Sequence, residues 1–198
     1  TEQLAQRKTE IRAAAHAARK QQADKETISR EITDRVVGLD EYQQAACVMW
    51  YVDVRDEART RHALPDALAS GKRIVIPYCV DGELELFHLE SMDELEIGMY
   101  KILEPRADLR EVESKRVAVD QLELILVPGV AFAARGGRTG HGKGYYDKLL
   151  ENAKPTTPLV ALAFDCQIFD EIPMQDHDIY MDKVVTQSGV YEGIGRTA

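Results

Sequence analysis

Cysteine is scarce in this chain, with three among 198 residues: Cys47, Cys79 and Cys166. They lie far apart, are odd in number and form no C-x-x-C pair, which argues against a disulfide framework and a zinc-binding pattern. Cys47 and Cys79 fall within apolar runs, so we expect both to be reduced core thiols in a reducing compartment. A catalytic cysteine is not expected, because no neighbouring residue would favour a thiolate.

Long hydrophobic runs are also missing. No apolar stretch approaches the roughly 20 residues that a membrane-spanning helix needs. Residues 1–20 are polar, Ala-rich and charged, and they lack the apolar segment of a secretory signal peptide. We therefore expect a cytoplasmic protein with no membrane partner. The rest of the composition, 44% hydrophobic and 30% charged, is typical of a globular protein with a full core.

Basic residues are fewer than acidic residues in this chain. With 25 basic and 34 acidic residues the formal net charge is −9, which argues against nucleic-acid binding and membrane-surface binding. Residues 135–148 reverse this sign, because four basic side chains stand there against one acidic side chain. The five are Arg135, Arg138, Lys143, Lys148 and Asp147. An anionic ligand is the natural partner for such a segment.

The N-terminal part of the chain predicts two helices. Residues 2–22 are rich in Ala, Gln, Lys and Arg and contain no Gly or Pro. Residues 25–37 carry apolar side chains at helical spacing, and Gly38 ends that pattern. We expect residues 1–38 to form a helical extension that packs on the remainder of the chain.

Short apolar runs predict buried strands further along the chain. They cover residues 45–52, 73–78, 84–89, 122–127, 159–164 and 183–187. Helices are expected over 56–70, where Pro65 bends the helix or marks its start, and over 145–152. This alternation predicts an α/β fold: a single three-layer α/β/α domain over residues 1–198 with a mostly parallel sheet. The Gly193/Gly195 segment and Thr197-Ala198 look like a frayed end.

One segment carries a pattern that points to chemistry. Residues 124–150 predict a strand, a Pro-Gly turn, a Gly-x-Gly-x-Gly loop and a helix. Backbone N–H groups in such a loop can bind an anion, and Arg138 and Lys143 could add charge-assisted hydrogen bonds. Asp147, one turn into the helix, could hold Mg²⁺ near phosphates.

The glycine pattern alone is weak support for phosphate binding. It matches neither the Walker A motif nor the dinucleotide fingerprint, and glycine loops also serve as plain connections. Asp147 could equally be a first-turn carboxylate that the helix dipole favours.

The longer string Val-Pro-Gly-Val-Ala-Phe-Ala-Ala-Arg-Gly-Gly-Arg-Thr-Gly-His-Gly-Lys-Gly-Tyr-Tyr-Asp, residues 127–147, resembles the signature of 5-formyltetrahydrofolate cyclo-ligases, also called methenyltetrahydrofolate synthetases. Further segments resemble the same family in order and spacing over nearly the whole chain. They are residues 8–12, 71–77, 98–105, 161–167 and 177–186. Three positions depart from the family's usual residues: Ala133 where an acid is usual, Thr139 where Leu is usual, and His141 at a variable position.

The resemblance implies an ATP-dependent C–N ligase of one-carbon metabolism. The implied reaction converts 5-formyltetrahydrofolate to 5,10-methenyltetrahydrofolate with release of ADP and phosphate, through a phosphorylated formyl intermediate. Arg138 and Lys143 are the implied catalytic residues. The nucleotide would contact Lys8, Arg12, Arg138, Thr139, Gly140, His141, Gly142, Lys143, Gly144, Tyr145 and Tyr146. The folate would contact Arg12, Val52, Glu57, Tyr100 and Tyr145, and Mg²⁺ would bind Asp147 and Asp178. We expect a monomer.

Each of these residues also has a plainer interpretation. Lys8 and Arg12, one helical turn apart, could form a solvated helix face. Glu57 follows a predicted strand, at the place where sheet ligands bind, and its carboxylate can accept two hydrogen bonds from a pterin. Glu57 could instead start a helix. Asp56 competes with Glu57 for the role in binding folate. Asp178 could belong to a solvated acidic loop.

The remaining candidates are apolar or aromatic. Val52 could be an ordinary core residue, and Tyr100 a partly exposed structural tyrosine. Trp50 and Tyr51 could stack on a flat ring, although strand aromatics that point inward are usually core residues. His141 and His177 have no further His or Cys at zinc-ligand spacing.

Two other functions fit parts of the pattern. A non-catalytic folate- or nucleotide-binding protein would keep the fold without turnover, and Ala133 and Thr139 leave room for it. A sugar-phosphate isomerase would need an acid/base carboxylate or lysine at the sheet end but no ATP loop. The fold alone does not decide between these functions.

Overall fold

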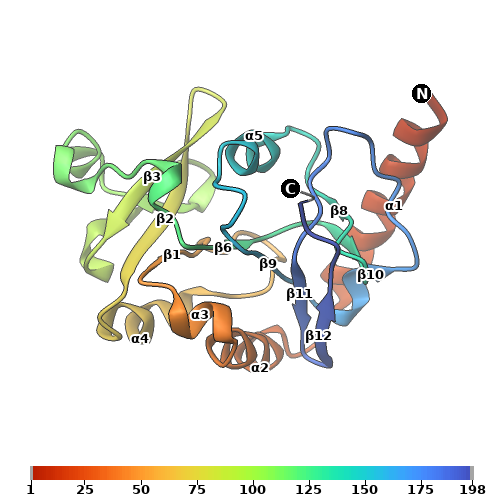
Figure 1. Cartoon of the computed structure of the whole chain (residues 1–198), viewed down its shortest axis with the longest axis horizontal. Helices are drawn as coiled ribbons and strands as arrows, with labels where there is room; N and C mark the ends of the chain where they lie inside the picture. The colour runs from red at the N-terminus through yellow and green to blue at the C-terminus, as the bar shows by residue number, and fades with distance from the viewer. Residues whose placement is uncertain (1, 197–198) are drawn as a thin grey trace.

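A seven-stranded sheet with the order β12-β11-β9-β6-β1-β2-β3 runs through the molecule (Figure 1). The computed structural model describes residues 2–196. Neighbouring strands from β11 to β2 are parallel, and β12 and β3 add antiparallel edges. The strands are β1 (Cys47–Met49), β2 (Arg73–Val80), β3 (Glu83–Leu89), β6 (Leu124–Val127), β9 (Leu159–Leu162), β11 (Lys183–Thr186) and β12 (Gly189–Glu192). The mostly parallel sheet is as predicted.

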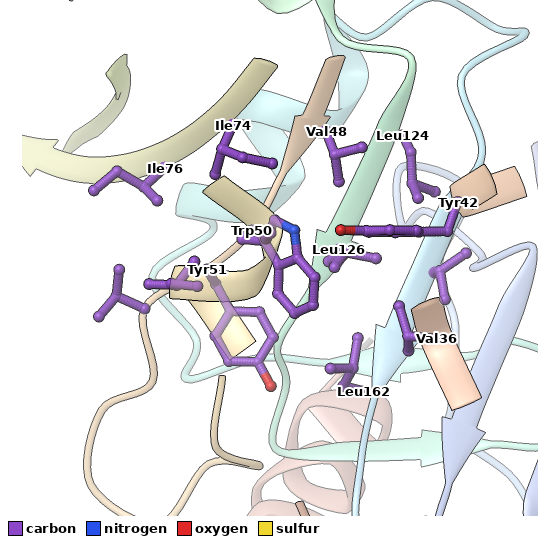
Figure 2. Close-up of a cluster of buried hydrophobic side chains, with 14 of the residues drawn as sticks. Val36, Tyr42, Val48, Trp50, Tyr51, Ile74, Ile76, Leu124, Leu126 and Leu162 are labelled. Atoms are coloured by element: carbon purple, nitrogen blue, oxygen red, sulfur yellow. The ribbon is translucent and has the colours of Figure 1, made fainter. Parts of the chain in front are cut away.

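Helices cover both faces of this sheet because its inner strands are apolar on both sides. Leu124 and Leu126 point into one core, shared with α2 (Lys25–Val37), α3 (Asp40–Gln44) and α4 (Leu64–Ala69). Figure 2 shows this core, in which Trp50 packs edge-on against Tyr42 with ring centroids 5.8 Å apart. The alternate residues Ile125 and Val127 point into a second core with α5 (Tyr145–Glu151). The three layers of the prediction are therefore present.

Helix α1 (Glu2–Gln21) does not pack on the large sheet. Its residues Ile11 and Ala15 contact a small sheet of β10 (Ile168–Phe169), β7 (Ala131–Ala133) and β8 (Arg138–Thr139). Figure 1 shows α1 beside β8 and β10. Among residues 2–196, no helix has the length and apolar character required to cross a bilayer.

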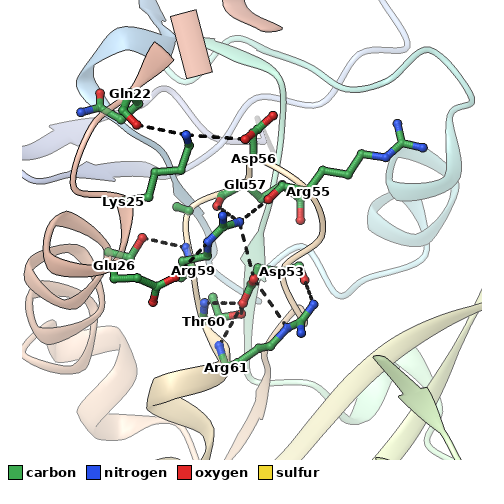
Figure 3. Close-up of polar contacts among 12 residues, drawn as sticks. Gln22, Lys25, Glu26, Asp53, Arg55, Asp56, Glu57, Arg59, Thr60 and Arg61 are labelled. Atoms are coloured by element: carbon green, nitrogen blue, oxygen red, sulfur yellow. Dashed lines mark hydrogen bonds and ion pairs between the residues drawn. The ribbon is translucent and has the colours of Figure 1, made fainter. Parts of the chain in front are cut away.

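The segment after β1 differs from the prediction. Strand pairing stops at Met49, although residues up to Val52 stay buried. Residues 56–60 are not helical, because the Asp53 carboxylate accepts hydrogen bonds from the backbone N–H groups of Thr60 and Arg61 at 2.9 and 3.0 Å (Figure 3). The helix begins only at Leu64, with Pro65 in its first turn.

Two further predictions were wrong. Cys79 is exposed, because the alternation along β2 points Tyr78 inward and its neighbour outward, whereas Cys47 is buried as predicted. The Gly193/Gly195 segment is not frayed: the Gly193 N–H donates to the carbonyl of Asp182 at 2.8 Å. Thr197-Ala198 lies outside the described residues.

Several short elements were not predicted, since they lack a long periodic pattern. They are the hairpin β4 (Leu95–Ile97) and β5 (Leu103–Pro105), and the 3-10 turns η1 (Arg61–Ala63), η2 (Met92–Glu94), η3 (Met99–Lys101), η4 (Ala107–Leu109), η5 (Glu113–Lys115), η6 (Val119–Gln121) and η7 (Asp165–Gln167). The hairpin matters here because residues of β5 line the cavity described next.

Candidate active site

A cavity of about 680 Å³ lies between α1, the segments after β1 and β6, and the glycine loop before α5. Almost all of the expected ligand-binding residues line it. They are Lys8, Arg12, Val52, Glu57, Arg138, Thr139, Gly140, His141, Gly142, Lys143, Gly144, Tyr145, Tyr146, Asp147 and Asp178. This volume is in the range of small-molecule sites in proteins. Their individual roles stay predictions, but folding brings these residues together.

The glycine loop owes its path to residues without side chains. Gly142 and Gly144 have φ values of 93° and 71°, a left-handed conformation that favours glycine. A Cβ on Gly142 would also lie 3.6 Å from the Arg12 guanidinium carbon. Arg12 in turn donates from Nε to the Gly140 carbonyl at 2.9 Å, which ties the loop to α1. The loop and α1 therefore form one wall of the cavity.

Helix α1 contributes basic side chains to this wall. Lys8 pairs with Asp178 and is 9% exposed, so the solvated-face alternative is wrong for this residue. One turn beyond Arg12, His16 stacks against the ring of His141, with centroids 5.4 Å apart. Arg19 is buried and donates to the carbonyl of Gly129 at 3.2 Å. His16 and Arg19 share the helix face of Arg12, but they are not among the residues that line the cavity.

Arg138 lies in the cavity floor. Its Nε donates to the Pro128 carbonyl at 2.9 Å, Nη1 lies 3.3 Å from Oδ1 of Asp147, and the guanidinium covers the ring of Tyr146. Burial lowers the pKa of Arg138, but a guanidinium stays charged in proteins. Its planar fork is therefore held in a fixed orientation toward the cavity.

The two carboxylates expected to bind metal each pair with a cation in this structure. Asp147 pairs with Arg138, and Asp178 pairs with Lys8, where both side chains are nearly buried. Within residues 2–196, no three or more His, Cys, Asp or Glu side chains gather as a ready metal cluster. A metal at this place would need oxygen atoms from a ligand or from water to complete its coordination.

Glu57 is buried, with 7% exposure, in the segment after β1. One carboxylate oxygen accepts the backbone N–H of Val54 at 2.9 Å, and the other lies 3.9 Å from Nε2 of His141. Glu57 does not start a helix, so that alternative is wrong. Asp56 instead pairs with Lys25 at 3.5 Å and does not line the cavity.

The structure does not bring Tyr100 into the cavity. Its side chain is 85% exposed, at a turn where both Tyr100 and Lys101 have positive φ values of 60° and 59°. This turn carries the side chain outward, whereas Ile102 and Leu103 just beyond it line the cavity. The contact of Tyr100 with folate stays a prediction, and in this structure its side chain lies outside the cavity.

The other aromatic candidates are divided between the core and the cavity. Trp50 is fully buried in the core and cannot stack on a ligand, while Tyr51 lines the cavity and donates to the Ala58 carbonyl at 2.7 Å. Tyr78 was not predicted as a site residue, yet it lines the cavity. Burial, together with its hydrogen bond to Glu85, raises the pKa of Tyr78 to about 12, so it stays protonated.

Two departures from the family's usual residues can now be located. Ala133 is buried in the small core beneath α1 and does not line the cavity. Thr139 is buried and does line it. The first departure therefore concerns the packing of α1, and the second concerns the ligand cavity itself.

Comparisons with known proteins agree with this geometry. The model of the 5-formyltetrahydrofolate cyclo-ligase family matches residues 4–187. A probable 5-formyltetrahydrofolate cyclo-ligase of Schizosaccharomyces pombe is 32% identical over 185 residues, which cover 86% of this chain and 88% of the relative. The 5-formyltetrahydrofolate cyclo-ligase of Escherichia coli K12 is 32% identical over 75% of this chain and 81% of its own.

Among solved structures, the NMR structure of 5,10-methenyltetrahydrofolate synthetase from Aquifex aeolicus has a TM-score of 0.81 at 30% identity. It covers 96% of this chain and 95% of its own. A family match over nearly the whole chain, relatives at this identity and a shared fold agree with one another. The chain belongs to the 5-formyltetrahydrofolate cyclo-ligase family, a family of ligases in folate one-carbon metabolism.

Proposed function

We propose that this protein uses Mg-ATP to convert 5-formyltetrahydrofolate to 5,10-methenyltetrahydrofolate, with release of ADP and phosphate. The observation that carries the proposal is one cavity in which a basic glycine loop and the buried Glu57 carboxylate face each other. The loop suits polyphosphate, and the carboxylate suits the donor groups of a pterin ring.

Glu57 and Val52 would hold the folate. Glu57 lines the cavity; one carboxylate oxygen accepts the Val54 N–H, which fixes its orientation, and the second oxygen lies 3.9 Å from Nε2 of His141. This second oxygen can accept a hydrogen bond from the aminopyrimidine edge of the pterin. Val52, which is 9% exposed, supplies an apolar wall beside it.

The chemical difficulty is that a formamide oxygen is a poor leaving group. Transfer of the γ-phosphoryl group from ATP to this oxygen releases ADP and leaves the formyl carbon bonded to a phosphate oxygen. N10 of the folate then bonds to that carbon and loses its proton to solvent, the C–O bond breaks, and phosphate departs with the electron pair of that bond. Positioning and charge neutralisation are what a protein contributes to such a transfer. Lys8, Arg138 and Lys143 would neutralise the phosphate oxygens.

The ion pairs in the cavity support this assignment. Asp147 and Asp178 have the oxygen ligands that Mg²⁺ prefers, and phosphate oxygens and water could complete its coordination. When bound, the ion would neutralise charge on the transferring phosphate. Arg138 and Lys8 would then exchange their carboxylate partners for phosphate oxygens. Each of these four side chains would then keep a partner of opposite charge with the ligands bound, as it has now.

An absorbance assay for methenyltetrahydrofolate, run with and without ATP, tests the proposal. We expect product only when ATP and Mg²⁺ are present. A protein that binds folate or nucleotide but forms no product would be a non-catalytic relative. Product formation without ATP would contradict the proposed phosphoryl transfer.

A further inference from the structure

The turn that follows β6 has three consecutive backbone carbonyls that accept hydrogen bonds from buried side chains. Arg138 donates from Nε to the Pro128 carbonyl at 2.9 Å. Gln167, at the end of η7, donates from Nε2 to the carbonyls of Gly129 and Val130, both at 3.0 Å. Pro128 and Gly129 line the cavity, so these hydrogen bonds determine the shape of part of its wall.

The Gly129 carbonyl has a second buried donor. Nη1 of Arg19, a residue of α1 that is 2% exposed, lies 3.2 Å from this oxygen. A carbonyl oxygen has two lone pairs, so Gln167 and Arg19 together satisfy it. A Cβ on residue 129 would clash with the fully buried ring of Phe132, so the turn approaches its own core closely. The turn is therefore held from α1 and from η7 at a position that has no room for a side chain.

Gln167 is itself held in one orientation. Its Oε1 accepts the backbone N–H of Phe164 at 2.9 Å, and the side chain is 1% exposed. A backbone N–H can only donate, so the amide oxygen must face Phe164 and the amide NH₂ must face the turn. Phe164 lies just beyond β9, which pairs with β6. Gln167 therefore joins the carboxyl ends of two neighbouring strands.

Arg138 depends on this turn in two ways. Its side chain is bound to the Pro128 carbonyl, and its strand β8 pairs with β7, which begins at Ala131 directly after the turn. The Val130 N–H also donates to the Thr139 carbonyl at 2.9 Å. A displacement of the turn would therefore move both the backbone and the guanidinium of Arg138, which lies in the cavity floor.

We propose that Gln167 is a positioning residue for Arg138. It holds the turn after β6, with Arg19 as the second support, and the turn directs the guanidinium fork toward the transferring phosphate. Gln167 does not line the cavity, so it acts through the turn and through Arg138. This inference rests on the proposed function, because it assigns the turn a part in phosphoryl transfer.

The first test follows the position of Arg138 without any reaction. Gln167→Met keeps a side chain of similar length but removes the amide that donates to the turn. The Nε–H signal of Arg138 can be identified by NMR through its loss in Arg138→Lys. We expect this proton to exchange with water about 10-fold faster in Gln167→Met than in the wild type, the change that corresponds to weakening one hydrogen bond.

Thr157→Val is the matched control. Thr157 is 4% exposed and donates from its hydroxyl to the Leu122 carbonyl at 3.0 Å, before the opposite end of β6. Neither residue lines the cavity. This variant also loses a buried hydrogen bond to a backbone carbonyl, so its melting temperature should fall. The Arg138 proton and kcat should nevertheless stay close to wild type.

Turnover gives the second measurement. We expect kcat of Gln167→Met to fall roughly 10- to 100-fold, the scale of misplacing a reacting group by about 1 Å, with the KM for folate nearly unchanged. In the Arg138→Lys background the same substitution should reduce kcat far less, because the fork that Gln167 positions is already missing. A purely structural role would instead reduce kcat by the same factor in both backgrounds.

A second variant keeps the test decisive if melting curves show that Gln167→Met does not fold. Arg19→Met removes the other donor to the Gly129 carbonyl and leaves η7 unchanged. It should accelerate exchange of the Arg138 proton and lower kcat in the same direction. Its effect on kcat should likewise shrink in the Arg138→Lys background.

The outcomes separate this inference from the proposed function. If a folded Gln167→Met variant keeps the wild-type exchange rate and kcat, or if Thr157→Val loses as much turnover, the inference is wrong. Independent, multiplying losses from Gln167→Met and Arg138→Lys would also overturn it. If the wild-type protein forms no methenyltetrahydrofolate, the proposed function fails, while exchange of the Arg138 proton still tests whether Gln167 positions this side chain.

Discussion

Two of the clusters of buried charge in residues 2–196 differ in how they are built. The first surrounds Asp53, which is 4% exposed, and its partners all come from the next eight residues (Figure 3). The carboxylate accepts two backbone N–H groups, and the guanidinium groups of Arg59 and Arg61 lie 3.8 and 3.6 Å away. The second cluster lines the cavity, where Lys8 pairs with Asp178 across 170 residues of sequence and Arg138 pairs with Asp147.

The two clusters differ in the kind of partner that each charged side chain has. Asp53 accepts hydrogen bonds from the backbone N–H groups of Thr60 and Arg61, so it determines the path of the chain between β1 and α4. The cavity pairs join side chains at the surface of an open space, where a ligand can replace either partner. A locally satisfied cluster serves the fold, whereas a pair formed across distant elements can serve binding. The following changes test this division.

The largest effect on stability should follow Asp53→Ala. The substitution leaves the backbone N–H groups of Thr60 and Arg61 without this acceptor, and an unsatisfied buried donor typically costs about 1–3 kcal/mol. Urea unfolding would measure the loss. Asp56→Ala is the matched control, because its partner Lys25 is 3.5 Å away and Asp56 is 41% exposed, which predicts a loss below about 1 kcal/mol. Similar losses in both variants would contradict the structural role of Asp53.

Arg138→Lys should reduce turnover more than binding. The lysine keeps the charge but loses the planar fork that can bridge phosphate oxygens. We expect kcat to fall roughly 10- to 1000-fold, the scale of losing one preorganised donor, with folate affinity nearly unchanged. Arg135→Lys, at an exposed arginine outside the cavity, should remain close to wild type. An unchanged kcat together with weaker folate binding would instead assign Arg138 to ground-state binding.

Asp147→Asn and Asp178→Asn should weaken the dependence on Mg²⁺ without unfolding the protein. Each asparagine keeps the shape of the side chain but loses the charge that a hard cation requires. We expect the Mg²⁺ concentration for half-maximal activity to rise roughly 10- to 100-fold, comparable to the loss of a supporting group at a metal site. Unfolding curves give the control. Wild-type activity of both variants at limiting Mg²⁺ would make these carboxylates purely structural.

The smallest effect concerns His62, which lies beside the Asp53 cluster and hydrogen-bonds Thr33 at 2.9 Å. Burial, and then the charge of Arg30, lowers the pKa of His62 below its ordinary value of 6.5. The unfolded chain therefore binds more protons below about pH 6.5, and the stability of the wild type falls as the pH drops through that window. His62→Gln should make this decline shallower in unfolding experiments while leaving kcat unchanged. If the free energy of unfolding depended on pH identically in both proteins, the predicted contribution of His62 would be wrong.

Sequence patterns predicted most of the long helices and the strands of the large sheet, and most of the cavity residues. Helix propensity and the spacing of apolar residues located α1 and α2 to within one residue, because a long regular segment shows its pattern in the sequence itself. Short segments failed: the stretch 56–60 looked helical, but the Asp53 side chain captured backbone groups that a helix would have used. The outward direction of the Tyr100 side chain could not be predicted either, since a motif gives the order of residues and not the direction of a side chain.

By itself, the sequence determined the three-layer architecture, the glycine loop and the family. These depend on apolar periodicity, on backbone freedom at glycine and on residue order, which are local properties. Only the tertiary structure decided which charges meet. It paired Lys8 with Asp178 and Arg138 with Asp147, and it brought His16, His141 and Glu57 together. Electrostatic interactions depend on distance in space, and folding sets that distance between residues that the chain keeps far apart.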